Sequence, residues 1–228
     1  MLTVVATPIG NMQDISFRAG RAILDAEFIL AEDTRSAGML RAKLAETFQH
    51  PIHPSQQLVS YYKEREFERL PYVFELLEAD HRVILLSENG MPLISDPGHL
   101  LIQKMIARDM HFEVIPGPTA LTTAIVHSGF DPTRFAFMGF LPKKDSEIAK
   151  QLRLAHDSPL ALSFIWYESP NRIQKTLRAL AQIDPEAQVC VCRELTKKFE
   201  EVVRGAPLEL AQREYRGEIT LVVSFSTS

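Results

Sequence analysis

Short apolar runs alternate with longer amphipathic segments through the first half of the chain, and this alternation limits the possible folds more than any other feature. Val83–Leu86 is an uninterrupted apolar run, which is typical of a strand that is covered on both faces. Phe28–Ala31 is a second such run, and a segment of helical pattern follows it from Thr34 to about Ala45. Strands that alternate with helices at this spacing predict βαβ units and therefore a parallel sheet.

The same patterns predict the remaining elements and divide the chain in two. In the first half we expect strands at 2–6, 28–31, 58–61, 83–86 and 112–115, a helix that starts near Ser16, and helices at 34–45, 64–78 and 98–108. In the second half we expect strands at 135–140, 160–166, 188–192, 199–204 and 218–225, and helices at 146–155, 171–182 and 208–212. The turn-forming residues at 129–132 interrupt the pattern. We therefore predict two α/β domains, at residues 1–118 and 119–228.

Two helix starts carry residues that are common at such positions. Ser16 is a candidate N-cap, and Phe17, Ile23 and Leu24 would then lie on the apolar side of the helix that it begins. Near the start of the helix expected at 171–182, Ser169 would be the cap and Pro170 the first helical residue.

Composition excludes several classes of protein. Hydrophobic residues make up 46% and charged residues 24% of the chain, which is ordinary for a folded soluble protein. The net charge of −4 argues against a globally basic nucleic-acid binder but leaves a local basic patch possible. No apolar run approaches the roughly 20 residues that span a bilayer. We therefore predict no membrane association.

Two features of the sequence indicate the cellular compartment: the N-terminal segment and the two cysteines. The first residues lack the basic region of a signal peptide and have the pattern of a strand. Cys190 and Cys192 are two positions apart, so on a strand they share one face, and buried reduced thiols are favoured over a metal site or a disulfide. We expect a cytoplasmic protein.

Three loops at expected strand ends are rich in proline and glycine. They are Thr7–Asn11, the segment 88–98 and Pro116–Ala120. Ligands of open α/β sheets bind outside the carboxyl ends of the strands, and proline and glycine preshape such loops. Each loop taken alone could be a tight turn and nothing more. Because neither phosphate-binding glycine motif occurs, a cofactor with few or no phosphates fits better than a nucleoside triphosphate or a dinucleotide.

Polar residues concentrate at a fourth strand end, Glu32-Asp33-Thr34-Arg35. Adjacent acids beside a base could orient a hydroxyl nucleophile or take its proton. The alternative is that Asp33 caps a helix and Arg35 is solvated. The sequence contains no G-x-S-x-G nucleophile motif. The histidines are scattered, with only His50 and His53 close together, so we predict no metal site.

Eight segments occur in an order that is characteristic of one family. They are VVATPIGN, ILAEDTR, GMPLISDPG, VIPGPTA, GFLPKK, YESPNRI, RELTKKFEE and GEITLVV. Together they resemble the tetrapyrrole methylase superfamily, from Val4 to Val223. Within it the chain is most similar to the bacterial methyltransferases that 2′-O-methylate a cytidine ribose in 16S ribosomal RNA. The resemblance implies two α/β domains with S-adenosylmethionine (SAM) in the cleft between them, a homodimer, and ribosomal RNA or the small ribosomal subunit as partner.

The resemblance also implies roles for particular residues. The expected catalytic residues are Glu32, Asp33 and Arg35, with one of the acids receiving the proton of the ribose hydroxyl. The expected cofactor-binding residues are Pro8, Gly10, Gly90, Met91, Pro92, Ile94, Asp96, Thr119, Ala120, Tyr167 and Leu195. Lys143, Lys144 and Arg172 are expected to hold RNA phosphates.

The chain departs from the family pattern at several positions. Glu88, Asn89 and Met91 stand where Asp, Ala and Thr are usual, and Asn171 stands where His is usual. The segment that begins Tyr61-Tyr62-Lys63 departs from the usual Y-H-x-x-N-E. Related enzymes also commonly continue beyond the last strand. Two alternatives therefore stay open: a methyltransferase acting on a tetrapyrrole-like carbon acid, and a non-catalytic homologue that binds SAM or RNA. The EDTR, YESP and RELTK segments favour the RNA enzyme over the first alternative.

Overall fold

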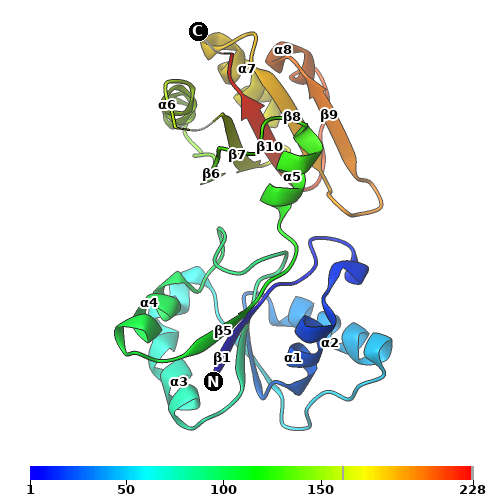
Figure 1. The fold of residues 1–228 in the computed structure, drawn as a ribbon, viewed down its shortest axis with the longest axis vertical. Coiled ribbons are helices and arrows are strands. Elements are labelled where there is room, and N and C mark those ends of the chain that lie inside the picture. The colour runs from blue at the N-terminus through cyan, green and yellow to red at the C-terminus, as the bar shows by residue number, and fades with distance from the viewer. Residues whose placement is uncertain (161, 227–228) are drawn as a thin grey trace. The chain divides into compact units, whose positions relative to one another are not determined.

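The computed structural model describes residues 1–160 and 162–226. The chain divides into two compact units, Met1–Thr119 and Ala120–Ser228. Each unit holds one five-stranded sheet with helices packed against it (Figure 1). Within the described residues, no helix has both the length and the apolar character that crossing a membrane requires.

The sheet of the first unit is parallel throughout. Its strands are β1 (Leu2–Val5), β2 (Phe28–Ala31), β3 (Gln57–Ser60), β4 (Val83–Leu86) and β5 (Phe112–Ile115), in the order β3-β2-β4-β1-β5. Strand β1 lies between β4 and β5 and pairs with both, so that Leu2 lies opposite Val83 and Phe112. The predicted parallel sheet is confirmed, and the carboxyl ends of all five strands meet at one edge.

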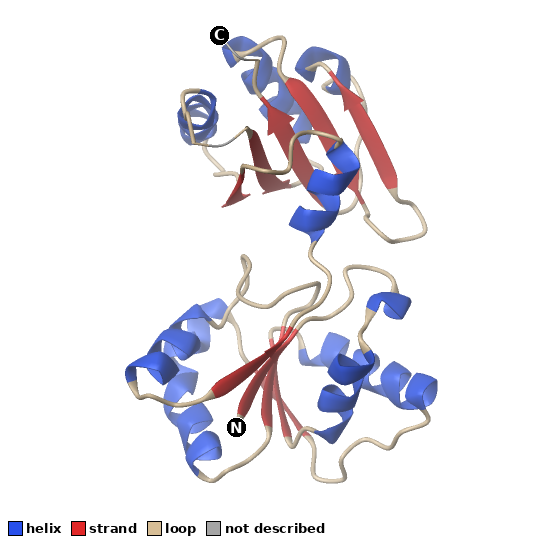
Figure 2. Ribbon diagram, in the orientation of Figure 1, coloured by secondary structure: helices blue, strands red, loops and turns tan. Residues whose placement is uncertain are grey.

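Helices cover both faces of this sheet (Figure 2). They are α1 (Phe17–Asp25), α2 (Thr34–Phe48), α3 (Glu66–Glu78) and α4 (His99–Ala107), together with the short 3₁₀ helices η1 (Met12–Asp14) and η2 (Lys63–Arg65). Alternate residues of each strand serve the two faces. Ile84 packs with α1 and α2, whereas its neighbour Leu85 packs with α3 and α4. This two-sided burial explains why β2 and β4 are apolar at every position.

The sheet of the second unit is mixed. Its strands are β6 (Phe135–Phe140), β7 (Ser163–Glu168), β8 (Gln188–Arg193), β9 (Glu201–Gly205) and β10 (Ile219–Ser224), in the order β6-β7-β10-β8-β9. Strand β6 runs parallel to β7, whereas β7–β10, β10–β8 and β8–β9 are antiparallel pairs. The helices are α5 (Ala120–Ser128), α6 (Asp145–His156), α7 (Ile173–Ile183) and α8 (Pro207–Leu210).

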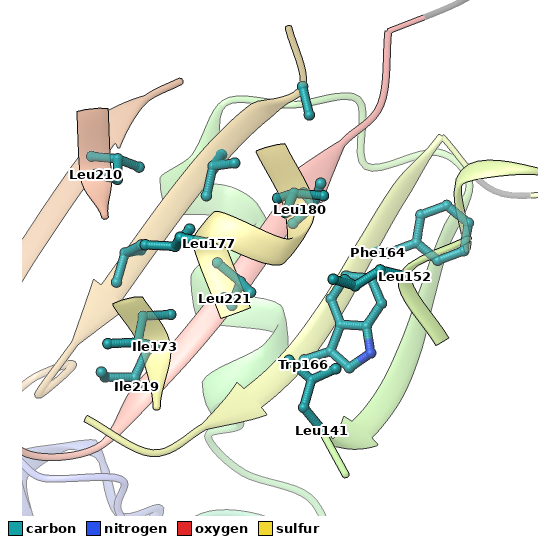
Figure 3. Packing of buried hydrophobic residues seen from close by; sticks show 14 of the residues in the cluster. Leu141, Leu152, Phe164, Trp166, Ile173, Leu177, Leu180, Leu210, Ile219 and Leu221 are labelled. Atoms are coloured by element: carbon teal, nitrogen blue, oxygen red, sulfur yellow. The ribbon is translucent and has the colours of Figure 1, made fainter. Parts of the chain in front are cut away.

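The core of the second unit lies between its sheet and helices α6, α7 and α8. Trp166, Leu177 and Leu221 are fully buried in this layer (Figure 3). Helix α5 packs against β7, β8 and β10. Cys190 and Cys192 are fully buried free thiols on β8, with their Sγ atoms 3.6 Å apart. The interpretation of this pair as buried reduced thiols is therefore confirmed.

The predicted burial of Phe17 is wrong, and so are the predicted starts of one strand and one helix. The Ser16 cap forms, because its Oγ accepts a hydrogen bond from the Ala19 amide, but Phe17 is 68% exposed. As the first residue of α1, Phe17 lies off the buried stripe and contacts the Phe48 ring instead. The expected 160–166 strand begins at Ser163, and position 161 lies outside the described residues.

The start of α7 is a further error. This helix begins at Ile173 with Arg172 as its N-cap, three residues later than the Ser169 cap that we expected. The Ser169 carbonyl accepts hydrogen bonds from the amides of Arg172 and Ile173. Pro170 therefore lies in a turn that precedes the helix. The contacts of the Arg172 side chain, described below, stabilise this turn, and the helix begins after it.

Candidate active site

Three loops at the carboxyl edge of the first sheet surround a cavity of about 190 Å³. The loops follow β1, β2 and β4. The lining residues are Thr7, Pro8, Gly10, Met12, Ala31, Glu32, Asp33, Ser36, Ala37, Leu40, Leu86, Ser87, Glu88 and Asn89. The fold thus brings Pro8 and Gly10, expected at the cofactor, together with Glu32 and Asp33, expected in catalysis.

This edge of the sheet is acidic. Glu32, Asp33 and Glu88 line the cavity. Burial, together with the charges of Glu32 and Glu88, raises the pKa of Asp96 to about 6. The carboxylates of Glu32, Glu88 and Asp96 together disfavour a phosphate group and favour a ligand with positive charge.

The two adjacent acids have different surroundings. Asp33 is the N-cap of α2, because its Oδ1 accepts a hydrogen bond of 2.7 Å from the Arg35 amide. Glu32 precedes the helix and is an exposed residue at the cavity. The capping role considered for Asp33 is therefore present in the structure. Arg35 is exposed on the first turn of α2 and is not among the residues that line the cavity.

The loop between β4 and α4, residues 87–98, is tied to its neighbours at Gly90. The Gly90 carbonyl accepts hydrogen bonds from the Thr7 amide (2.8 Å) and from Ser87 Oγ (2.7 Å). Gly90 has a φ of +84°, and a Cβ there would lie 3.0 Å from Ile9 Cγ2 and 3.2 Å from the Pro118 carbonyl oxygen. Glycine is required because the loops after β1, β4 and β5 meet at this residue.

Two non-glycine residues of this loop adopt left-handed backbone conformations. Leu93 has a φ of 71° and Ser95 a φ of 72°, each of which costs of order 1–3 kcal/mol and is most common at functional sites. Met91 and Leu93 are half-buried and pack against the hydrophobic core under the loop. Pro92 is buried, Asp96 is half-buried and Ile94 is exposed. Thr119 and Ala120, which follow β5, are half-buried.

The residues expected in the second unit group around the end of β7. Tyr167 is half-buried, and its ring contacts the rings of Phe137 and Phe140 at centroid distances of 4.9 and 5.3 Å. Leu195 is buried in the loop after β8. Leu195 is thus largely packed within its own unit, whereas Tyr167 keeps part of its surface exposed.

The expected phosphate-binding cations differ in exposure. Arg172 forms an ion pair of 2.6 Å with the buried Glu168 and donates a 2.8 Å hydrogen bond to the Pro142 carbonyl. Lys143 and Lys144, directly after Pro142, are exposed. Arg172 thus supports the loop that carries the two lysines.

Comparison with known proteins identifies the family. The model of the family described as Tetrapyrrole (Corrin/Porphyrin) Methylases matches residues 1–211. The chain belongs to the tetrapyrrole methylase family. It is 40% identical over 228 residues to Ribosomal RNA small subunit methyltransferase I of Hydrogenobaculum sp. (strain Y04AAS1), covering 98% of this chain and 95% of that protein. A protein of the same name from Thermotoga maritima is 34% identical, with 98% and 97% coverage.

Solved structures of tetrapyrrole methylases share the fold. Uroporphyrin-III C-methyltransferase from Thermus thermophilus, complexed with S-adenosylhomocysteine, matches with a TM-score of 0.65 and 17% identity, covering 98% of this chain and 96% of that one. Diphthine synthase matches with a TM-score of 0.69 and 16% identity, covering 100% and 90%. The predicted two-domain α/β architecture of the tetrapyrrole methylase type is confirmed.

Sequence reasoning missed several residues of this tetrapyrrole methylase. Ser36 and Leu40 line the cavity from α2, and their spacing of three and seven residues from Asp33 could have indicated the same helix face. Ser87 Oγ donates a hydrogen bond to the Gly90 carbonyl, but in the sequence Ser87 only follows an apolar run, and nothing there indicates this contact. Glu66 contacts the start of α4, and no local pattern links these two positions.

Proposed function

We propose that this chain is a SAM-dependent methyltransferase that methylates the ribose 2′-oxygen of a cytidine in small-subunit (16S) ribosomal RNA. The observation that carries this proposal is the convergence of the loops after β1, β2 and β4 on one acid-lined cavity. It occurs in a chain that is 34–40% identical, over nearly the whole length of both proteins, to proteins named Ribosomal RNA small subunit methyltransferase I.

The residues present fit SAM. This cofactor carries a sulfonium and an ammonium cation and no phosphate, so the carboxylates of Glu32, Glu88 and Asp96 favour it electrostatically. When bound, SAM supplies a methyl group activated for nucleophilic attack. The residues that would hold it are Pro8, Gly10, Gly90, Met91, Pro92, Ile94, Asp96, Thr119, Ala120, Tyr167 and Leu195.

The chemistry requires positioning and the removal of one proton. A ribose hydroxyl that attacks a methyl group in line needs alignment more than covalent catalysis. Glu32 is the better candidate to receive the hydroxyl proton, because Asp33 already accepts a hydrogen bond from its own helix. Arg35 would contact the substrate beside these acids. Lys143 and Lys144 would hold phosphates of the RNA, with Arg172 supporting their loop.

The proposal includes the partners and the compartment. The substrate would be ribosomal RNA or the small ribosomal subunit, and the enzyme would act as a homodimer in the cytoplasm. Methylation of a tetrapyrrole-like carbon acid has the family match and the shared fold in its favour, but the solved methyltransferases of that kind are only 14–18% identical to this chain. The relatives of higher identity favour RNA.

Methyl transfer from radiolabelled SAM to small ribosomal subunits from an unmethylated strain tests the proposal. We expect one methyl group per subunit, at a site that resists alkaline cleavage because its 2′-oxygen is blocked. Free 16S RNA and a tetrapyrrole are the comparison substrates. Label in the tetrapyrrole alone would establish the other enzyme class. SAM binding without transfer to any substrate would indicate a non-catalytic homologue.

A further inference from the structure

Glu66 is a buried carboxylate that does not line the cavity. It is the first residue of α3 and only 8% exposed. Charged side chains are seldom buried unless they are paired or hydrogen-bonded. The hydroxyl of the fully buried Tyr61 donates to Glu66 Oε1 at 3.2 Å. The same oxygen accepts backbone N–H groups of Gly98 (3.2 Å), Leu100 (3.0 Å) and Leu101 (3.2 Å).

These three N–H groups belong to the start of α4. The first N–H groups of a helix have no partner within the helix, and they form the positive end of its dipole. The N-cap of α4 is Gly98, which has no side chain and makes no side-chain cap hydrogen bond. Glu66 thus provides, from another helix, the cap that the sequence of α4 lacks. A carboxylate in this position makes charge-assisted hydrogen bonds, which are stronger than neutral ones.

The cap fixes one end of the strained loop. The other end is fixed at Gly90 by the Thr7 amide and Ser87 Oγ. Between these two anchors lie Leu93 and Ser95, both left-handed. Backbone strain of this kind persists only where the surrounding structure imposes it. The shape of the loop therefore depends on both anchors, and Glu66 is the anchor on the side of α4.

We propose that Glu66, supported by Tyr61, is a positioning residue that holds the 87–98 loop in the conformation that binds SAM. The inference rests on the proposed function, because it takes this loop as part of the cofactor site. Glu66 acts through the backbone amides of Gly98, Leu100 and Leu101 and does not contact the cofactor. Its loss should therefore weaken cofactor binding while the chemistry of bound substrates persists.

The test compares Glu66→Ala, Glu66→Gln and Tyr61→Phe with Glu68→Gln. Glu68 is an exposed glutamate in the same first turn of α3, so this control removes the same charge without touching the cap. SAM affinity is measured by calorimetry, steady-state kinetics are measured with small ribosomal subunits, and amide hydrogen exchange is measured at residues 98–101.

We expect Glu66→Ala to raise the Kd and KM for SAM by about 10- to 100-fold, the usual cost of losing a residue that orients a binding group. The effect of Glu66→Gln should be smaller, because its neutral oxygen still accepts hydrogen bonds, and that of Tyr61→Phe smaller again. The kcat at saturating SAM and the KM for subunits should stay near wild-type values. Exchange at residues 98–101 should accelerate in the Glu66 variants, and Glu68→Gln should match wild type throughout.

The possible outcomes are distinct. Wild-type protein that fails to bind SAM would overturn the proposed function and this inference with it. If wild type binds SAM and the Glu66 variants bind it equally well, the positioning role is wrong while the proposed function stands. A lower melting temperature of the Glu66 variants with an unchanged KM for SAM would also overturn the positioning role, since Glu66 would then only stabilise the fold as a helix cap. If Glu66→Ala does not fold, Glu66→Gln and Tyr61→Phe decide by the same criteria.

Discussion

Glu32 and Asp33 are adjacent acids at the end of β2, and their different hydrogen bonding separates their roles. Asp33 caps α2 through the Arg35 amide, whereas Glu32 is exposed at the cavity. Because cap formation uses one carboxylate oxygen of Asp33, Glu32 is better placed to accept a proton from a substrate hydroxyl. Adjacency in the sequence therefore does not imply a shared function.

Glu32→Gln should slow single-turnover methyl transfer by about 10²- to 10⁴-fold, the usual contribution of a general base. The melting temperature should change little, since Glu32 caps no helix, and SAM affinity should fall by much less than the rate, since Glu88 and Asp96 keep their carboxylates. Asp33→Asn is the matched control, because asparagine is an equally good N-cap. Full activity of Glu32→Gln, or a larger loss in Asp33→Asn, would contradict this assignment.

The raised pKa of Asp96 predicts that the stability of the protein depends on pH. This pKa is raised from 3.8 to about 6 by burial and by the charges of Glu32 and Glu88. Between about pH 4 and pH 6 the folded protein thus binds this proton more tightly than the unfolded chain does, so ionisation destabilises the fold as the pH rises through this window.

Asp96→Asn should therefore stabilise the protein above about pH 6 and have no such effect near pH 4. The two-unit shift corresponds to about 3 kcal/mol, which we reduce to about 1–2 kcal/mol because the side chain is partly exposed. On the proposed function, SAM affinity should also fall, since a negative charge of the proposed cofactor site is lost. Urea unfolding of both proteins at about pH 4 and pH 8 measures the difference, and an equal stability change at both pH values would contradict it.

At the scale of elements, the 87–98 loop depends on glycine where it joins α4. Gly98 has a φ of +119°, and a Cβ there would lie 2.5 Å from Leu85 Cδ2 and 3.2 Å from Leu93 Cδ1. Real Cβ atoms do not approach so closely, and the backbone conformation itself is unfavourable for other residues. The join between loop and helix therefore tolerates no side chain without movement.

Gly98→Ala should lower the free energy of unfolding by about 1–3 kcal/mol through overpacking and backbone strain. It should also weaken SAM binding, because the loop must shift. Gly129→Ala is the control: this glycine also has a positive φ, +72°, but a Cβ there would meet nothing within 4 Å. Gly129→Ala should lower the free energy of unfolding by about 1 kcal/mol and leave the SAM affinity unchanged. Equal effects of the two substitutions would show that the Leu85 contact is not limiting.

At the scale of the molecule, we expect a homodimer, as the resemblance to other tetrapyrrole methylases implies. Light scattering at micromolar concentration should give a mass of about twice the 25.8 kDa of one chain. Dilution should lower this mass if association is reversible. A mass near that of a single chain at all concentrations would contradict the prediction.

Much of the fold follows from local sequence pattern. The strands Phe28–Ala31, Val83–Leu86 and Phe112–Ile115 occur at the predicted residues. The first two do so because strands buried on both faces form short apolar runs that polar turns interrupt. Phe112–Ile115 is instead an edge strand that contains Glu113. The prediction of α7 was in error at its start, where Arg172, which forms an ion pair with Glu168, is the N-cap residue. Glycine and proline content located two of the three loops that line the cavity, those after β1 and β4, whereas the Pro116–Ala120 loop is not among the lining residues.

The sequence by itself determined most of the strands, the caps formed by Ser16 and Asp33, and the family, because each is encoded in short segments of the chain. Only the tertiary structure decided that Glu66 caps α4 from 32 residues away, and that Glu32 and Glu88 raise the pKa of Asp96. Such contacts depend on how strands and helices pack. No local periodicity carries that information, since hydrogen bonds and charge interactions require distances of a few ångströms between side chains that the fold alone brings together.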